Sequence, residues 1–122
     1  MPEIAEAMLL RIFVAENDRL HGRPLHRALV EKAQEMKMAG ATVLPAPIGF
    51  GQSRMVRCDM NVDAGPHLPI VIEIIDTEEN IARFLPAIDG MIESGLVTLE
   101  KVKAAFYRKA AKPALADKAQ PP

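Results

Sequence analysis

The sequence predicts an α+β domain with the ferredoxin-like order βαββαβ, in which an antiparallel four-stranded sheet carries two helices on one face. Two observations predict this order. Short runs rich in apolar and β-branched residues, at 7–15 and 68–75, are typical of strands. Segments at 24–38 and 76–95 repeat apolar residues at helical spacing. At 122 residues the chain has room for one domain.

The composition is that of a soluble globular protein, with 49% apolar and 25% charged residues. A net charge of −1 gives no field that would draw nucleic acid, and four Phe, one Tyr and no Trp are too few for a base-stacking platform. The single Cys58 suits a reducing compartment, and the acidic N-terminus does not resemble a secretory signal. We therefore predict a cytoplasmic protein without a nucleic-acid partner.

The first strand, at 7–15, is apolar on both faces except for Arg11. A polar loop at 16–24 ends in a proline, which suits the first turn of a helix. That helix is predicted to run to about Met38 and to end at Gly40. Its apolar side consists of Leu25, Ala28, Leu29, Ala33 and Met36.

The second strand, at 41–50, contains Pro45 and Pro47, which only an edge strand tolerates. The following segment, 51–67, alternates charged and apolar residues before a Gly-Pro pair. We predict a long, exposed and mobile excursion there, although the alternation also fits a short hairpin.

The third strand, at 68–75, is dense in β-branched residues and is predicted to be central. Asp76 is the expected N-cap of the next helix, with Glu79 completing a capping box. Pro86 should kink this helix, and Gly95 should close it.

The fourth strand is predicted at 101–107, where apolar residues alternate with Lys101, Lys103 and Tyr107. The folded domain therefore spans 1–107. The remaining residues, 108–122, are rich in Ala, Lys and Pro, and we expect a disordered tail.

The first and third strands are apolar on both faces, yet two helices on one side can cover only one face. The other face needs a partner subunit, so we predict a homo-oligomer. Arg11 and Glu73 are the only charges inside these two strands, which are neighbours in this topology. We expect them to form an ion pair where the subunits meet.

A Gly-Phe-Gly turn follows the second strand, with Gly49 and Gly51 on either side of Phe50. Residues without a Cβ allow a positive φ or a close approach of a ligand to the backbone. Such a spacing is often only a bend in the backbone. The helix that follows the glycines in a dinucleotide-binding fingerprint is also missing here.

Several motifs together resemble the PII signal-transduction proteins, and within them a PII-like branch known as a domain of unknown function. The motifs are Gly22-Arg-Pro-Leu25, the run from Gly40 to Gln52 with its Gly-Phe-Gly turn, Leu68-Pro-Ile-Val-Ile-Glu73, Asp76-Thr-Glu-Glu79 and Gly95-Leu-Val-Thr98. The resemblance covers about 8–107. It implies a trimer that binds an adenine nucleotide between neighbouring subunits. Residues 52–67 take the place of the T-loop, which reports the ligand to a partner such as a membrane transporter or channel.

The resemblance places Gly49, Phe50, Gly51 and Gln52 beside the ligand, followed by Ser53. Guanidinium groups suit phosphate, so Arg54 and Arg57 are further candidates, as is Arg23 before the first helix. Lys101 and Lys103 on the last strand complete the expected set. PII proteins have a glycine-rich phosphate loop with a basic residue before the last strand. Only Glu93-Ser-Gly-Leu-Val97 stands there, so AMP, ADP or a cyclic nucleotide is a better candidate than a triphosphate.

We predict neither catalysis nor a metal site. The candidate metal ligands have no recognisable spacing; they are His21, His26, His67 and Cys58. Glu16 and Asp18 could be paired carboxylates, but no motif places a nucleophile beside them. Two alternatives remain open. One is a small α+β-barrel isomerase or oxygenase that uses Glu16, His21 or Glu73; the other is a ligand-free protein-interaction adaptor.

Overall fold

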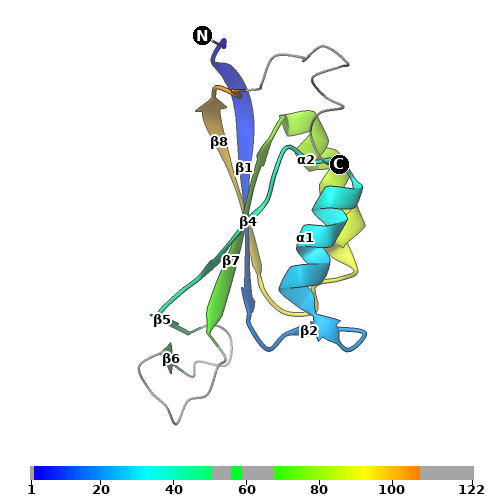
Figure 1. The fold of residues 1–122 in the computed structure, drawn as a ribbon, viewed down its shortest axis with the longest axis vertical. Coiled ribbons are helices and arrows are strands. Elements are labelled where there is room, and N and C mark those ends of the chain that lie inside the picture. The colour runs from blue at the N-terminus through cyan, green and yellow to red at the C-terminus, as the bar shows by residue number, and fades with distance from the viewer. Residues whose placement is uncertain (1, 51–55, 59–67, 108–122) are drawn as a thin grey trace, which may run out of the picture.

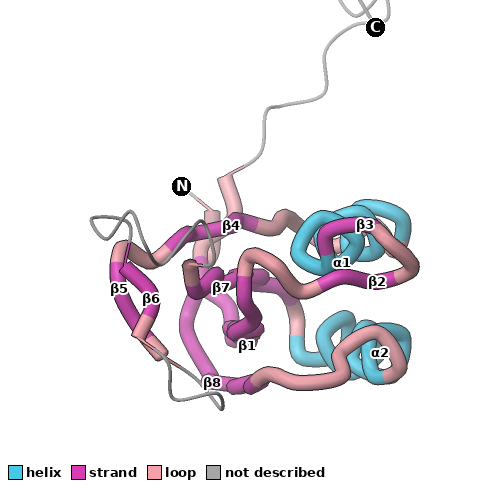
Figure 2. Tube along the Cα trace, turned by 90° about the horizontal axis from the view of Figure 1, so that it is seen from below, coloured by secondary structure: helices cyan, strands magenta, loops and turns pink. Residues whose placement is uncertain are grey.

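The computed structural model describes residues 2–50, 56–58 and 68–107 and shows the predicted ferredoxin-like fold. One antiparallel sheet has the strand order β4-β7-β1-β8. Its strands are β1 (Ala5–Ala15), β4 (Thr42–Pro45), β7 (Pro69–Asp76) and β8 (Leu96–Ala104). Helices α1 (Leu25–Glu35) and α2 (Glu78–Asp89) lie side by side on one face of this sheet (Figure 1). Seen from below, the sheet and the helices form two separate layers (Figure 2).

The hydrophobic core lies between these two layers. Every second residue of β1 and β7 points to the helices, since side chains alternate between the faces of a strand. The apolar stripes of both helices meet them. The most deeply buried side chains are Leu10, Ile12, Leu29, Ile72, Ile74, Ile81, Phe84 and Ile88.

Two short ladders flank the main sheet. Strands β2 (Arg19–Leu20) and β3 (Arg23–Pro24) pair within the segment that was predicted to be a loop. His21 and Gly22 between them have φ angles of 51° and 80°, as a two-residue type I′ hairpin requires. Strands β5 (Ile48–Gly49) and β6 (Arg57–Cys58) form the second ladder. A short hairpin was the alternative prediction for 51–67, but the observed ladder begins earlier, at Ile48.

The predicted end of the first helix was wrong. Helix α1 ends at Glu35, because Lys37 takes a left-handed φ of 59° two residues later. The amide of Met38 donates to the carbonyl of Ala33, and that of Lys37 to Gln34, which is the pattern of a Schellman motif. The left-handed residue that ends the helix is therefore Lys37 and not Gly40.

The second helix also differs from the prediction at both ends. Thr77, not Asp76, is the N-cap: its Oγ1 accepts the amide of Asn80 at 3.1 Å, so Glu79 does not complete a capping box. The helix ends at Asp89, well before Gly95. Pro86 lies inside α2, which continues for three residues beyond it.

The last strand begins and ends earlier than predicted, at Leu96–Ala104 instead of 101–107. Gly95 makes the early start possible, because a Cβ there would lie 2.7 Å from the backbone oxygen of Phe13. The second strand is also divided, into β4 and β5. Strand β4 lies at the sheet edge, as its prolines predicted.

The side chain of Asp76, at one end of the sheet, forms hydrogen bonds to the segment after α1 and to the start of α2. Its carboxylate is only 4% exposed and accepts the amides of Ala39 at 2.8 Å and Thr77 at 2.7 Å, and the side-chain amide of Asn80 at 2.9 Å. Burial alone would raise the pKa of Asp76. The hydrogen bonds from Asn80, Ala39 and Thr77, together with the charge of Arg83, hold that pKa below its ordinary value.

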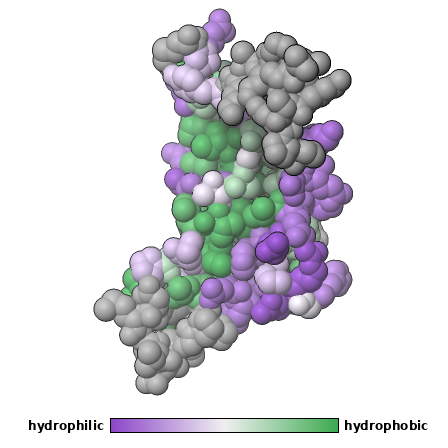
Figure 3. Space-filling view, viewed as in Figure 1, coloured by the Kyte–Doolittle hydropathy of each residue, from purple (hydrophilic) through white to green (hydrophobic). Residues whose placement is uncertain are grey.

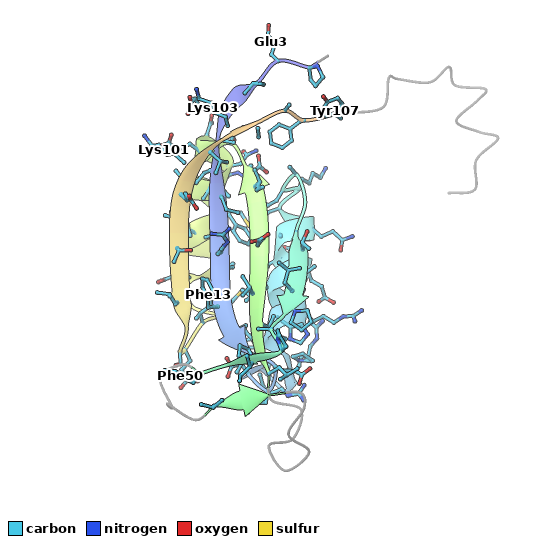
Figure 4. The ribbon with its side chains drawn as sticks, turned by 90° about the vertical axis from the view of Figure 1, so that its left-hand side faces the viewer. Glu3, Phe13, Phe50, Lys101, Lys103 and Tyr107 are labelled. Carbon is cyan, nitrogen blue, oxygen red and sulfur yellow. The ribbon has the colours of Figure 1, made fainter. Side chains whose placement is uncertain are left out.

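The face of the sheet away from the helices is apolar around a central ion pair. Arg11 and Glu73 stand directly opposite each other, as predicted, and Arg11 Nε donates to Glu73 Oε2 at 2.9 Å. The strand register places Leu44, Ile75 and Leu96 on the same face, with 44%, 40% and 57% of their surface exposed. Figure 4 looks onto this face, and no other described segment covers it. We call it the open face. Viewed from the β4 edge, apolar side chains gather over the strands, whereas polar ones gather over α1 (Figure 3).

Replacing Asp76 by Asn should remove an acid-sensitive part of the stability. The folded pKa of Asp76 lies below the unfolded value of about 3.9, so its stabilisation is complete above that value and is lost as the pH falls through the folded pKa. We expect Asp76→Asn to cost about 2 kcal/mol at pH 7. Urea unfolding of both proteins from pH 7 to acid checks this. The difference should shrink below pH ~4; a constant difference would contradict the assignment.

Candidate functional site

The Gly-Phe-Gly turn begins where the chain leaves the sheet edge. The amide of Ala46 still bonds to the carbonyl of Pro69 at 2.9 Å, and β5 then pairs with β6, with Gly49 opposite Arg57. A Cβ on Gly49 would lie 3.0 Å from Cγ of Pro69. Among the described glycines only Gly22 has a positive φ. Gly49 is therefore needed for close packing against Pro69 and not for a left-handed backbone.

The surface around this turn is apolar. Phe50 exposes 62% of its surface, Ile48 58% and Val56 54%. The sequence analysis singled out Phe50 but missed Ile48 and Val56. These two residues could have been found from the alternation of apolar residues before and after the turn. In a short ladder, such alternating side chains lie on the same face. Gly51, Gln52, Ser53 and Arg54 lie outside the described residues.

Arg23 lies at the same end of the sheet but on the helix side. Figure 2 shows β2 and β3 next to α1, away from β5 and β6. Both Arg23 and Arg27 pair with the carboxylate of Glu31, the latter at 3.5 Å, and the hydrogen bond from Arg23 lowers the pKa of Glu31. The structure therefore does not bring Arg23 to the Gly49 turn of the same chain.

Lys101 and Lys103 lie at the opposite end of the sheet from the turn. Lys103 pairs with Glu6 near the start of β1, whereas Leu96, at the other end of β8, pairs with Phe13. Figure 4 shows both lysines near the upper end and Phe50 at the lower end. Seven residues of strand, roughly 23 Å, separate the rows. One chain cannot place these cations and the turn around one small ligand.

The connection between α2 and β8, at 90–95, reaches the same end of the sheet as the Gly49 turn, where β8 begins beside Phe13. It contains Glu93 and no basic residue. This connection therefore supplies no positive charge to a chain of phosphates.

Among the carboxylates considered for catalysis, Glu73 lies apart from the other two. Glu73 is bound to Arg11 in the middle of the open face. Glu16 follows β1, and one of its carboxylate oxygens is buried without a described hydrogen-bond partner. His21 is exposed in the β2–β3 turn, and Asp18 accepts the amide of Ala15 at 2.9 Å. Within the described ranges no three His, Cys, Asp or Glu side chains form a group that could hold a metal ion.

The layer arrangement and strand order place this chain in a class of known structures. It is similar to a putative PII-like signalling protein from Thermus thermophilus, with a TM-score of 0.62 and 23% identity, over 84% of this chain and 93% of that one. It is also similar to CPII, a nitrogen regulatory PII-like protein from Thiomonas intermedia, with a TM-score of 0.66 and 14% identity, over 87% and 94% of the two chains. The fold is that of PII-like signalling proteins.

Sequence comparison gives the family. Residues 7–104 match DUF190, described as "Uncharacterized ACR". The UPF0166 protein of Aquifex aeolicus is 40% identical over 103 residues, which cover 84% of this chain and 97% of that protein. A UPF0166 protein of Methanocaldococcus jannaschii is 30% identical over 95 residues, covering 77% and 87%. The chain belongs to the DUF190 family. In the part that the structure describes, no helix is long and apolar enough to cross a membrane.

Gly49→Ala tests the packing requirement at the turn. The added methyl group would press on the ring of Pro69, so we expect a loss of about 1 kcal/mol or more in the free energy of unfolding. The matched control is Gly40→Ala, since a Cβ on Gly40 meets nothing within 4 Å and should be neutral or slightly stabilising. Urea unfolding measures both. Equal stability of the two variants would show that Gly49 is not held by close packing.

Proposed function

We propose that this protein is a cytoplasmic PII-like regulator that assembles as a homotrimer and binds a small adenine nucleotide in the clefts between its subunits. AMP, ADP or a cyclic nucleotide is the expected ligand. Residues 52–67 serve as the T-loop that reports the ligand to a partner, with a membrane transporter or channel as the candidate. The protein makes and breaks no bond, and 1–107 is its functional domain.

The placement of the candidate ligand residues at two ends of one sheet is the observation that carries this proposal. Gly49 and Phe50 lie at one end, Lys101 and Lys103 at the other. A site that uses both groups needs a second copy of the chain. The open face supplies the reason for copies to associate, because burying its exposed apolar side chains is favourable.

The choice of ligand rests on charge and on the structural neighbours. The CPII structure is described as bound to ADP, AMP and bicarbonate. In this chain the 90–95 connection offers no basic group, and the cations come from β8 of a neighbour. Two lysines match the charge of a mono- or diphosphate better than that of a triphosphate.

Signalling would follow from a shift between conformations. A ligand held at Gly49 and Phe50 lies next to the 52–67 segment, because the ladder of β5 and β6 places Gly49 opposite Arg57 within that segment. If the ligand binds one conformation of that segment more tightly than another, it raises the population of that conformation. The exposed Ile48, Phe50 and Val56 give a partner an apolar contact at the same place.

Leu96→Glu should break the trimer. Leu96 is on the open face, and a buried carboxylate without a partner costs several kcal/mol in an interface. Leu99→Glu is the matched control, because Leu99 is on the same strand and half exposed, but pairs with Leu10 on the helix side. Light scattering after size exclusion should give a monomer for the first variant and a trimer for the second. A wild-type monomer, or equal effects of both substitutions, would contradict the interface.

Nucleotide binding is tested with a thermal-shift panel of AMP, ADP, ATP, cyclic AMP and bicarbonate, followed by calorimetry. A nucleotide at 100 times its Kd should stabilise the protein by about 2.7 kcal/mol. Removing both cations with Lys101→Gln and Lys103→Gln should weaken binding at least tenfold, since a hydrogen bond to a charged group contributes about 1.5 kcal/mol or more and ~1.4 kcal/mol corresponds to a factor of ten. Lys32→Gln, on α1, is the control. If no compound stabilises the trimer, the result favours a ligand-free protein-interaction adaptor over a nucleotide sensor.

A further inference from the structure

A cavity lies at the end of the sheet remote from the Gly49 turn. Its volume is about 610 Å³, within the range of small-molecule sites. Three segments line it: the connection after α1, the junction of β7 and α2, and the residues that follow β8. Strand β7 runs eight residues, roughly 23 Å, from Pro69 beside the turn to Asp76 in this cavity. The cavity is therefore separate from the Gly49 turn within a chain.

The polar wall of the cavity offers hydrogen-bond acceptors in a fixed position. Asp76 is held by three hydrogen bonds from described residues and is buried. A carboxylate has about four acceptor positions, so one remains for a donor in the cavity. The side chain of Asn80 stands next to it and is fixed by the bond to Asp76. This wall suits an ammonium group.

The opposite charge comes from Lys37 at the rim. Lys37 is exposed and has no ion pair with any described residue. Its left-handed backbone, with a φ of 59°, fixes where the side chain leaves the chain. A cavity with one cation and one anion is complementary to a zwitterion.

The remaining wall is apolar and aromatic. Phe106, Tyr107 and Met38 line it, and Tyr107 exposes 73% of its surface. Aromatic rings and a thioether favour a planar ring as ligand, through stacking and sulfur–aromatic contacts. Figure 4 shows Tyr107 at the upper end of the sheet, away from Phe50.

We propose that this cavity binds a small zwitterion that carries a planar ring, an aromatic α-amino acid in chemical class. The ammonium group lies at Asp76 and Asn80, and the carboxylate lies at Lys37. The ring lies against Tyr107 and Phe106. The cavity shares its end of the sheet with Lys101 and Lys103, but neither lysine lines it, so the proposal does not rest on the nucleotide cleft.

The chain itself supplies the reporter for the test. Tyr107 is the single tyrosine, and there is no tryptophan, so all tyrosine emission comes from a residue that lines this cavity. The probes are L-phenylalanine, phenethylamine, which lacks the carboxylate, and 3-phenylpropionate, which lacks the ammonium group. We expect a saturable change in Tyr107 emission, with L-phenylalanine binding at least tenfold more tightly than either of the others. No saturable change with any probe, by emission and by calorimetry, overturns the proposal.

Lys37→Asn separates the two charged contacts. Asn tolerates the left-handed backbone, so the loop keeps its shape while the cation is lost. Binding of L-phenylalanine and 3-phenylpropionate should weaken at least fivefold, and binding of phenethylamine should not change. Asn80→Ala should have the reverse selectivity, weakening only the two amines. Lys32→Gln, on the solvent side of α1, should change nothing. An equal loss for all three probes in Lys37→Asn, or no loss, overturns the assignment.

Discussion

Strands β1 and β7 are apolar on both faces, and two helices on one side can cover only one of them. This constraint explains where the core lies and why one face of the sheet is exposed. The inner face forms the core with the helices. The outer face remains open in the described chain and carries Arg11 and Glu73 at its centre. A charged pair inside an apolar face fixes the register of the two strands, because a slip of one strand by one residue would turn its charge towards the core and leave the other charge without its partner.

The sequence predicted correctly those elements in which apolar residues repeat at the spacing of a strand or a helix. The alternation in β1 and β7, the stripes of both helices and the prolines of the edge strand each follow from side-chain geometry alone. The Arg11–Glu73 pair followed from topology, since these strands are neighbours in a βαββαβ sheet. The exposed apolar surface beside Phe50 could have been predicted from the same alternation.

The errors lie where the backbone conformation depends on distant residues. A left-handed Lys37 has no sequence signature, so Gly40 was taken as the helix end instead. Three of the four residues from Leu96 to Leu99 are apolar, which fits a helix or a strand, and pairing of Leu96 with Phe13 decides between them. Gly49 was predicted to lie beside a ligand, whereas the constraint that the structure shows there, the approach of Pro69, is a tertiary contact. The Asp76 cavity was missed because three separate segments build it.

The two edges of the sheet differ in how they are protected. Strand β4 is short and contains Pro45, whereas β8 is nine residues long and has no proline. A long free edge invites another strand to add to it, which is the first step of aggregation. Lys101 and Lys103 place two positive charges on this edge, and like charges oppose pairing with an identical strand. These lysines therefore act as gatekeepers for a newly made chain before it meets its partners, whatever they bind afterwards.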